Sequence, residues 1–65
     1  MKPHEIRALL VKKQIKQIDL ATELGVTLPA VNGVINGYWL SRRVCEHIAK
    51  RLKRPVEKLF PRLAA

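Results

Sequence analysis

The sequence predicts an all-α fold made of five short helices. Apolar residues recur at the spacing that places them on one face of a helix, as Leu20, Ala21 and Leu24 do. Glycine, proline and hydroxyl residues stand where such helices would stop and start. The chain has 65 residues, of which 48% are apolar. We therefore expect one compact domain over residues 1–65, with a single helical core that hides only about 60% of the unfolded surface.

The segment 17–37 predicts two helices joined by a tight turn. Gly25 falls where the first helix must end in a left-handed conformation, which costs glycine little. Thr27 can then cap a second helix over about residues 27–36, and Pro29 is tolerated in the first turn of that helix. This order of apolar, small and glycine positions is the helix-turn-helix pattern. The alternative is an αα-hairpin in another kind of small helical protein.

The charge of the chain favours a polyanionic partner. Thirteen Lys and Arg residues against five Asp and Glu residues give a net charge of +8, which suits nucleic acid or an anionic membrane surface. The membrane interpretation is weaker, because no apolar run approaches spanning length and no signal peptide is visible. The lone Cys45 cannot form an internal disulfide. We expect it to be a core residue in a reducing cytoplasm.

The second helix of the motif is predicted to have two different faces. No charged residue occurs in the range 24–41, as suits a helix that faces phosphates or a segment that is simply buried. Val31, Val34 and Ile35 have the spacing of a core face. The outward positions are Thr27, Leu28, Pro29, Asn32, Gly33 and Asn36. A glycine inside a helix costs about 1 kcal/mol, so we expect Gly33 to permit a close approach, either to DNA or to another helix.

The flanking helices are predicted from their apolar stripes and their ends. A first helix over residues 3–13 begins at Pro3, and Ile15 in the following link turns inward. A fourth helix, capped by Ser41, runs to about residue 53. A short helix over residues 55–60 closes the core, and residues 62–65 form a loose tail.

Four residues near the start of the fourth helix lead to separate expectations. Arg42 and Arg43 occupy the helix end that is unfavourable for cations, so their charge should cost stability unless an external anion such as DNA phosphate binds there. Tyr38 can place its hydroxyl on a phosphate. We expect Trp39 to plug the core between the third and fourth helices; direct contact with DNA is the alternative.

The chain resembles a known group of proteins. The pattern QxxxLA..LGV…AV…IN is similar to the lambda-repressor-like five-helix DNA-binding domains. The Trp39 step, the IAKRL run and the closing EKLFP resemble more narrowly the Ner-type regulators of transposable phages and their bacterial relatives. The resemblance implies a transcription regulator, often a repressor, that places its second motif helix in the major groove. It also implies that Gln17 touches the DNA backbone.

Two functions from different classes remain in view. The first is a sequence-specific regulator that binds double-stranded DNA as two copies in a bacterial nucleoid or a phage-infected cell. The second is a helical interaction module such as an antitoxin or an adaptor. An enzyme has little support, since His4 and His47 lie far apart in sequence and neither has a metal-ligand or nucleophile motif beside it. We expect no cofactor, no metal, no small-molecule substrate and no membrane contact.

Overall fold

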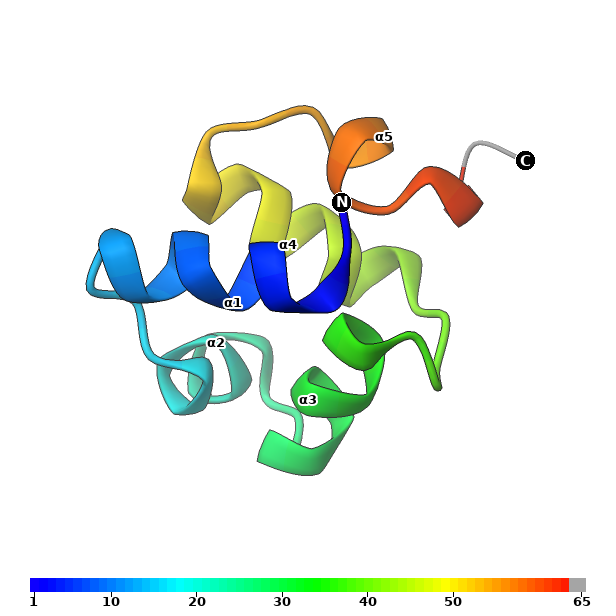
Figure 1. Cartoon of the computed structure of the whole chain (residues 1–65). Helices are drawn as coiled ribbons and strands as arrows, with labels where there is room; N and C mark the ends of the chain where they lie inside the picture. The colour runs from blue at the N-terminus through cyan, green and yellow to red at the C-terminus, as the bar shows by residue number, and fades with distance from the viewer. Residues whose placement is uncertain (64–65) are drawn as a thin grey trace.

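A computed structural model describes residues 1–63, which form five α-helices and one 3₁₀ turn (Figure 1). The elements are α1 (Pro3–Lys12), α2 (Gln17–Leu24), α3 (Leu28–Asn36), α4 (Arg42–Leu52), α5 (Val56–Leu59) and η1 (Pro61–Leu63). In the view of Figure 1, α2 and α3 lie below α1 and α4, and α5 lies on the far side from α3. Within the described residues there is no strand. The predicted all-α, five-helix class is confirmed.

The turn between α2 and α3 follows its sequence signals. Gly25 ends α2 in the left-handed region at φ +69°, and its N–H donates to the α2 carbonyls. Thr27 then caps α3, because its hydroxyl accepts a hydrogen bond from Ala30 N–H at 3.2 Å. Between the two helices the chain direction turns by 114°, within the range of about 90–120° usual for a helix-turn-helix.

The core lies where the inner faces of all five α-helices meet. Cys45 is fully buried, as predicted, and this burial raises the pKa of its thiol. Ile15 packs against the core from the link after α1. The buried hydrophobic residues are Ile6, Leu10, Leu20, Ala21, Leu24, Val31, Val34, Ile35, Val44, Cys45, Ile48, Ala49, Leu52, Leu59 and Phe60.

Trp39 does not belong to this core. Its side chain is 52% exposed, so the prediction of an aromatic plug between α3 and α4 is wrong. The reason lies in the backbone after α3, where the N–H groups of Tyr38 and Trp39 both donate to the Gly33 carbonyl, at 2.9 and 3.2 Å. This reversal carries Trp39 back along the outside of α3 and places its ring on Gly33.

The predicted loose tail is also wrong in its first part. Residues 61–63 form η1, and the guanidinium of Arg62 donates a hydrogen bond to the Gly37 carbonyl at 2.9 Å. This bond ties the end of the chain to the turn that follows α3. Residues 64 and 65, the rest of the predicted tail, lie outside the described residues.

No single helix between residues 1 and 63 is long and apolar enough to cross a membrane. The pair α2 and α3 reaches the required length and composition only when both helices are counted together across their sharp bend.

Candidate nucleic-acid interface

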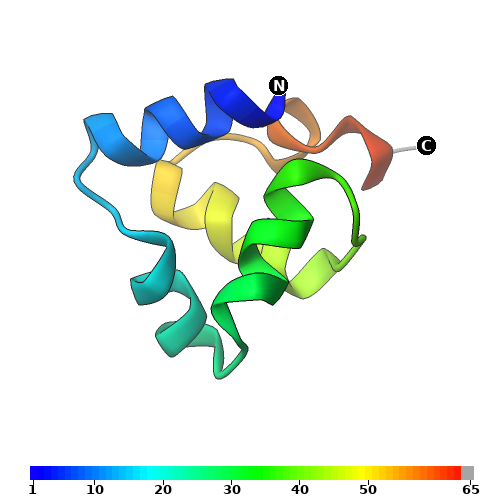
Figure 2. The same cartoon turned by 60° about the horizontal axis from the view of Figure 1, so that its bottom comes forward.

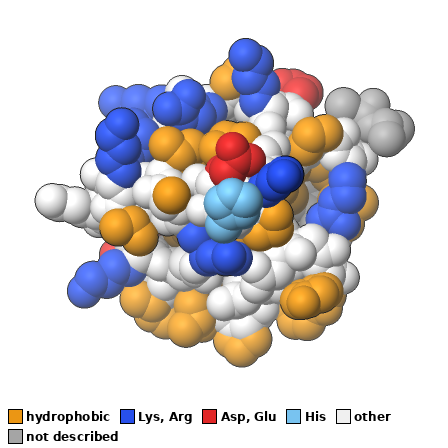
Figure 3. Space-filling model, viewed as in Figure 1, with side chains coloured by type: hydrophobic (Ala, Val, Ile, Leu, Met, Phe, Trp, Pro, Cys, Tyr) orange, Lys and Arg blue, Asp and Glu red, His pale blue; other side chains and the backbone are white. Residues whose placement is uncertain are grey.

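The exposed face of α3 carries most of the predicted contact residues. Thr27, Leu28, Pro29 and Asn32 are exposed, and Asn36 is half-buried. Turning the molecule brings α3 to the front without another helix covering it (Figure 2). The space-filling view shows hydrophobic side chains along the edge formed by α2, α3 and the loop after α3 (Figure 3).

Gly33 differs from this prediction, because it is buried rather than open to solvent. A Cβ atom added at Gly33 would lie 3.1 Å from Cδ2 of the Trp39 ring. The close approach that the glycine permits is therefore to an aromatic side chain of the next loop, and not to another helix.

A chain of hydrogen bonds holds the side-chain amides of Asn32 and Asn36 on α3. Asn36 donates through Nδ2 to Oδ1 of Asn32, and Arg7 of α1 donates to Oδ1 of Asn36 at 2.5 Å. This arrangement leaves the Nδ2 hydrogens of Asn32 and one lone pair of its Oδ1 free for a ligand. Sequence analysis missed Arg7, since no local signal marks a contact between residues 29 positions apart.

Two grooves flank α3, and Leu28 and Asn32 line both. The first, of about 730 Å³, lies between α1, the start of α2 and α3, and Val11 and Ile18 expose apolar surface in it. The second, of about 430 Å³, is bounded by Pro29, Gly33, Tyr38 and Trp39. The outer face of α3 is thus a ridge between two mainly apolar hollows.

Two further predicted contact residues lie at the edges of this face. Tyr38 is 82% exposed in the loop after α3, so its hydroxyl is free to meet a ligand. Gln17 begins α2 and is half-buried, and its Oε1 atom accepts no hydrogen bond from the described part of the chain. Gln17 and Asn32 both line the larger groove.

Arg42 and Arg43 have different partners at the start of α4. Arg42 is exposed and lies 3.6 Å from the Glu46 carboxylate. Arg43 instead donates a 2.7 Å hydrogen bond to the carbonyl of Leu24, the last residue of α2. Both side chains therefore have partners within the protein, which the argument from the helix dipole alone does not include. Arg43 satisfies a carbonyl that the end of α2 leaves open.

A second contact between α2 and α4 fixes the motif from the other side. The Glu23 carboxylate accepts a hydrogen bond from Arg51 and lies 2.6 Å from Nε2 of His47. The bond from Arg51 is the larger cause, and the bond to His47 the second, of a lowered pKa for Glu23. His47 thus belongs to a polar contact between α2 and α4. No group of three or more metal-ligating side chains occurs in the described part of the chain.

Residues 6–59 match the helix-turn-helix family model. The chain belongs to this family. Its members bind double-stranded DNA as transcription regulators and are generally not enzymes. The match also supports the broader, lambda-repressor-like resemblance. Searches among curated proteins and among solved structures gave no match.

In this helix-turn-helix protein, α2 and α3 are the two motif helices, and α3 is in the position of the recognition helix. Its exposed face has Asn32 at the centre and Leu28 and Pro29 near the N-terminal end. An amide can pair with the edge of a base, whereas apolar carbons can contact a thymine methyl group. The face therefore carries both kinds of group that direct base recognition uses.

Proposed function

We propose that this protein is a sequence-specific transcription regulator that acts as a repressor by placing α3 in the major groove. Two copies bind one operator, because a domain of 65 residues covers only a short stretch of DNA. They act in the cytoplasm of a bacterium or a phage-infected cell, in line with the resemblance to Ner-type regulators. Asn32 contacts a base. The other positions of the motif proposed to face the major groove are Thr27, Leu28, Pro29, Gly33 and Asn36. Gln17, Tyr38, Arg42 and Arg43 contact the DNA backbone in this proposal.

The observation that carries the proposal is the hydrogen-bonded pair Asn32 and Asn36 on the exposed face of α3. Asn32 projects from an uncharged helix surface, and its amide can donate and accept at the same time. This is the group that pairs with N6 and N7 of adenine in the major groove. The bond from Arg7 to Asn36 limits the freedom of the amides before DNA arrives.

Selection of bound sites from a pool of random duplexes tests this function. We expect an enriched motif whose half-sites recur about 10 base pairs apart, because two copies related by two-fold symmetry dock one helical turn apart. Failure to enrich any sequence would contradict the proposed function. It would favour the interaction-module alternative if the protein retained a protein partner.

Asn32→Ala tests the base contact on the selected duplex. The variant should lose about 1–3 kcal/mol of binding free energy on the selected site and little on random duplexes. Equal loss on both kinds of DNA, measured by titration at one salt concentration, would show that Asn32 does not recognise a base.

A further inference from the structure

The groove of about 430 Å³ beside α3 has an unusual wall, the ring of Trp39. The position of this ring is set by backbone contacts, since the N–H groups of Tyr38 and Trp39 share the Gly33 carbonyl. The absence of a side chain at Gly33 then lets the indole lie against the helix, where a Cβ atom would approach Cδ2 and Cε3 to 3.1 and 3.3 Å. A helix-destabilising glycine is thus matched to one particular aromatic neighbour.

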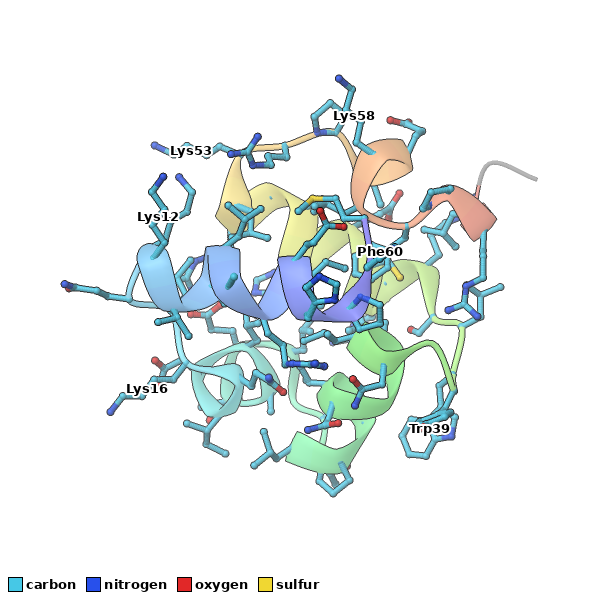
Figure 4. The ribbon with its side chains drawn as sticks, viewed as in Figure 1. Lys12, Lys16, Trp39, Lys53, Lys58 and Phe60 are labelled. Carbon is cyan, nitrogen blue, oxygen red and sulfur yellow. The ribbon has the colours of Figure 1, made fainter. Side chains whose placement is uncertain are left out.

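Trp39 nevertheless remains 52% exposed, and the groove beside it is bounded by Leu28 and Pro29 of α3. Figure 4 shows Trp39 at the α3 edge of the molecule, pointing away from the core. Among residues 1–63, no charged residue lines this groove, and Asn32 lies on its border. The groove borders the recognition helix and exposes apolar surface, so we expect it to bind an apolar group of the ligand that this helix contacts.

We propose that this groove, named here the Trp39 slot, binds the 5-methyl edge of a thymine in the major groove. The proposal rests on the function proposed above and specifies what α3 recognises. Among the base edges of the major groove, the thymine methyl is the apolar group, and the other edges present donors and acceptors. The net charge of +8 complements the charge of DNA, which makes DNA rather than an apolar protein helix the expected occupant.

Replacing thymine by uracil tests the slot, because uracil lacks the methyl group and keeps the same hydrogen-bonding edge. Each thymine of the selected duplex is replaced in turn, and affinities are measured for the wild-type protein. We expect one thymine in each half-site at which uracil weakens binding about fourfold, the factor that corresponds to burying one methyl group. If no thymine behaves in this way on an enriched site, the slot is wrong while the proposed function stands.

The Trp39→Ala variant then assigns the effect. The ratio of thymine to uracil affinities at the sensitive position should fall from about fourfold to about one. Leu40→Ala is the matched control, since Leu40 is the next loop residue, is 58% exposed and does not line the groove. It should leave the ratio unchanged. An unchanged ratio in Trp39→Ala would overturn the proposed Trp39 slot. An equal loss of affinity for the thymine, uracil and random duplexes would overturn it too, because that result indicates that Trp39 contacts a sugar or a phosphate.

Gly33→Ala provides a second variant that does not depend on removing the ring. Alanine favours the helix, but its Cβ atom must push the indole away from α3. The ratio of thymine to uracil affinities at the same position should therefore fall, although the protein stays folded.

Trp39 is also the only tryptophan of the chain, so its fluorescence should become protected from quenching by iodide when the protein binds the selected duplex. An indole that stays fully quenchable in the complex would overturn the slot. Failure to enrich any duplex would overturn both proposals.

Discussion

Asn32 is supported by Asn36 of the same helix and, through Asn36, by Arg7 of α1. Its Oδ1 atom accepts from Asn36, and Asn36 accepts from Arg7 on α1. An amide that is already oriented loses less conformational entropy when it pairs with a base. If Asn32 contacts a base as proposed, Arg7 is a positioning residue that acts on base recognition through the two asparagines.

Arg7→Gln should reduce discrimination at the base that Asn32 is proposed to contact, by about 0.5–1.5 kcal/mol, the cost of immobilising one side chain on binding. Affinities for the selected duplex and for a duplex with that base pair changed provide the measurement. In an Asn32→Ala background the same substitution should have no further effect on discrimination, because the group that it orients is gone. Lys12→Gln removes the same charge from an exposed position on the same helix, and it should leave discrimination unchanged. If Arg7→Gln reduced discrimination equally in the wild type and in the Asn32→Ala background, the positioning role of Arg7 would be contradicted.

At the scale of elements, α4 holds α2 in place at two points. Arg43 binds the last carbonyl of α2, and Glu23 of α2 binds Arg51 and His47 of α4. Both contacts join α2 to α4, and neither involves a side chain of α3. The geometry of the motif therefore depends on polar contacts as well as on its apolar core.

Arg43→Gln should destabilise the free protein by about 1 kcal/mol, because a charge-assisted hydrogen bond to Leu24 is lost. This is the opposite of what the helix-dipole argument alone predicts for this position. Arg42→Gln is the control, since its exposed pair with Glu46 contributes about 0–1 kcal/mol and its hydrogen bond to the Leu63 carbonyl is long, at 3.4 Å. Urea unfolding of both variants gives the comparison. Equal stability of the two variants would mean that the bond to Leu24 contributes nothing.

The Glu23 contact predicts a dependence of stability on pH. Hydrogen bonds from Arg51 and then from His47 lower the pKa of Glu23 in the folded protein. Its contribution is therefore fully present above the unfolded pKa of about 4.3 and is lost as the pH falls through the lower, folded value. In Glu23→Gln, the free energy of unfolding should decrease less steeply over this acidic range than in the wild type. Glu57→Gln, at an exposed carboxylate of α5, is the control. If Glu57→Gln reduced the pH dependence of the free energy of unfolding as much as Glu23→Gln, the contact of Glu23 would have no special role.

At the scale of the whole molecule, the positive charge is spread over more than the recognition surface. Lys12, Lys53 and Lys58 lie on the side away from α3 (Figure 4), whereas Arg42 begins α4 directly after the loop that carries Trp39. Charges on the far side can attract DNA over a distance but cannot contact the phosphates beside α3. Variants at the two ends of α4 can therefore distinguish general charge attraction from the proposed phosphate contact of Arg42.

Arg42→Gln should reduce the slope of log K against log salt by about 0.9, the value for one lost phosphate contact. Lys53→Gln removes the same charge at the opposite end of α4 and should change the slope less. Binding of Arg42→Gln should weaken on selected and random duplexes alike, since a phosphate contact carries no sequence information. If both variants reduce the slope equally, the general positive charge explains the salt dependence of binding. The proposal that Arg42 contacts a phosphate would then be wrong.

The sequence by itself determined the features that depend on residues a few positions apart. The caps at Thr27 and Ser41, the left-handed end at Gly25 and the apolar stripes of the helices all involve neighbours within one or two turns, and all are present in the structure. These local signals were sufficient for the five helices and, apart from the buried Gly33, for the outward face of α3. They also indicated the class of ligand, through the pattern of the motif and the net charge.

Only the tertiary structure decided which distant groups meet. Arg7 finds Asn36 across 29 positions, and Arg43 finds Leu24 across 19. The place of Trp39 is a related case, because aromatic character suggests burial while the backbone bonds to Gly33 turn the ring to the outside of α3. In each case the partner is set by the angle at which helices cross and by the direction of a loop. Neither quantity is encoded in the spacing of residues along one helix.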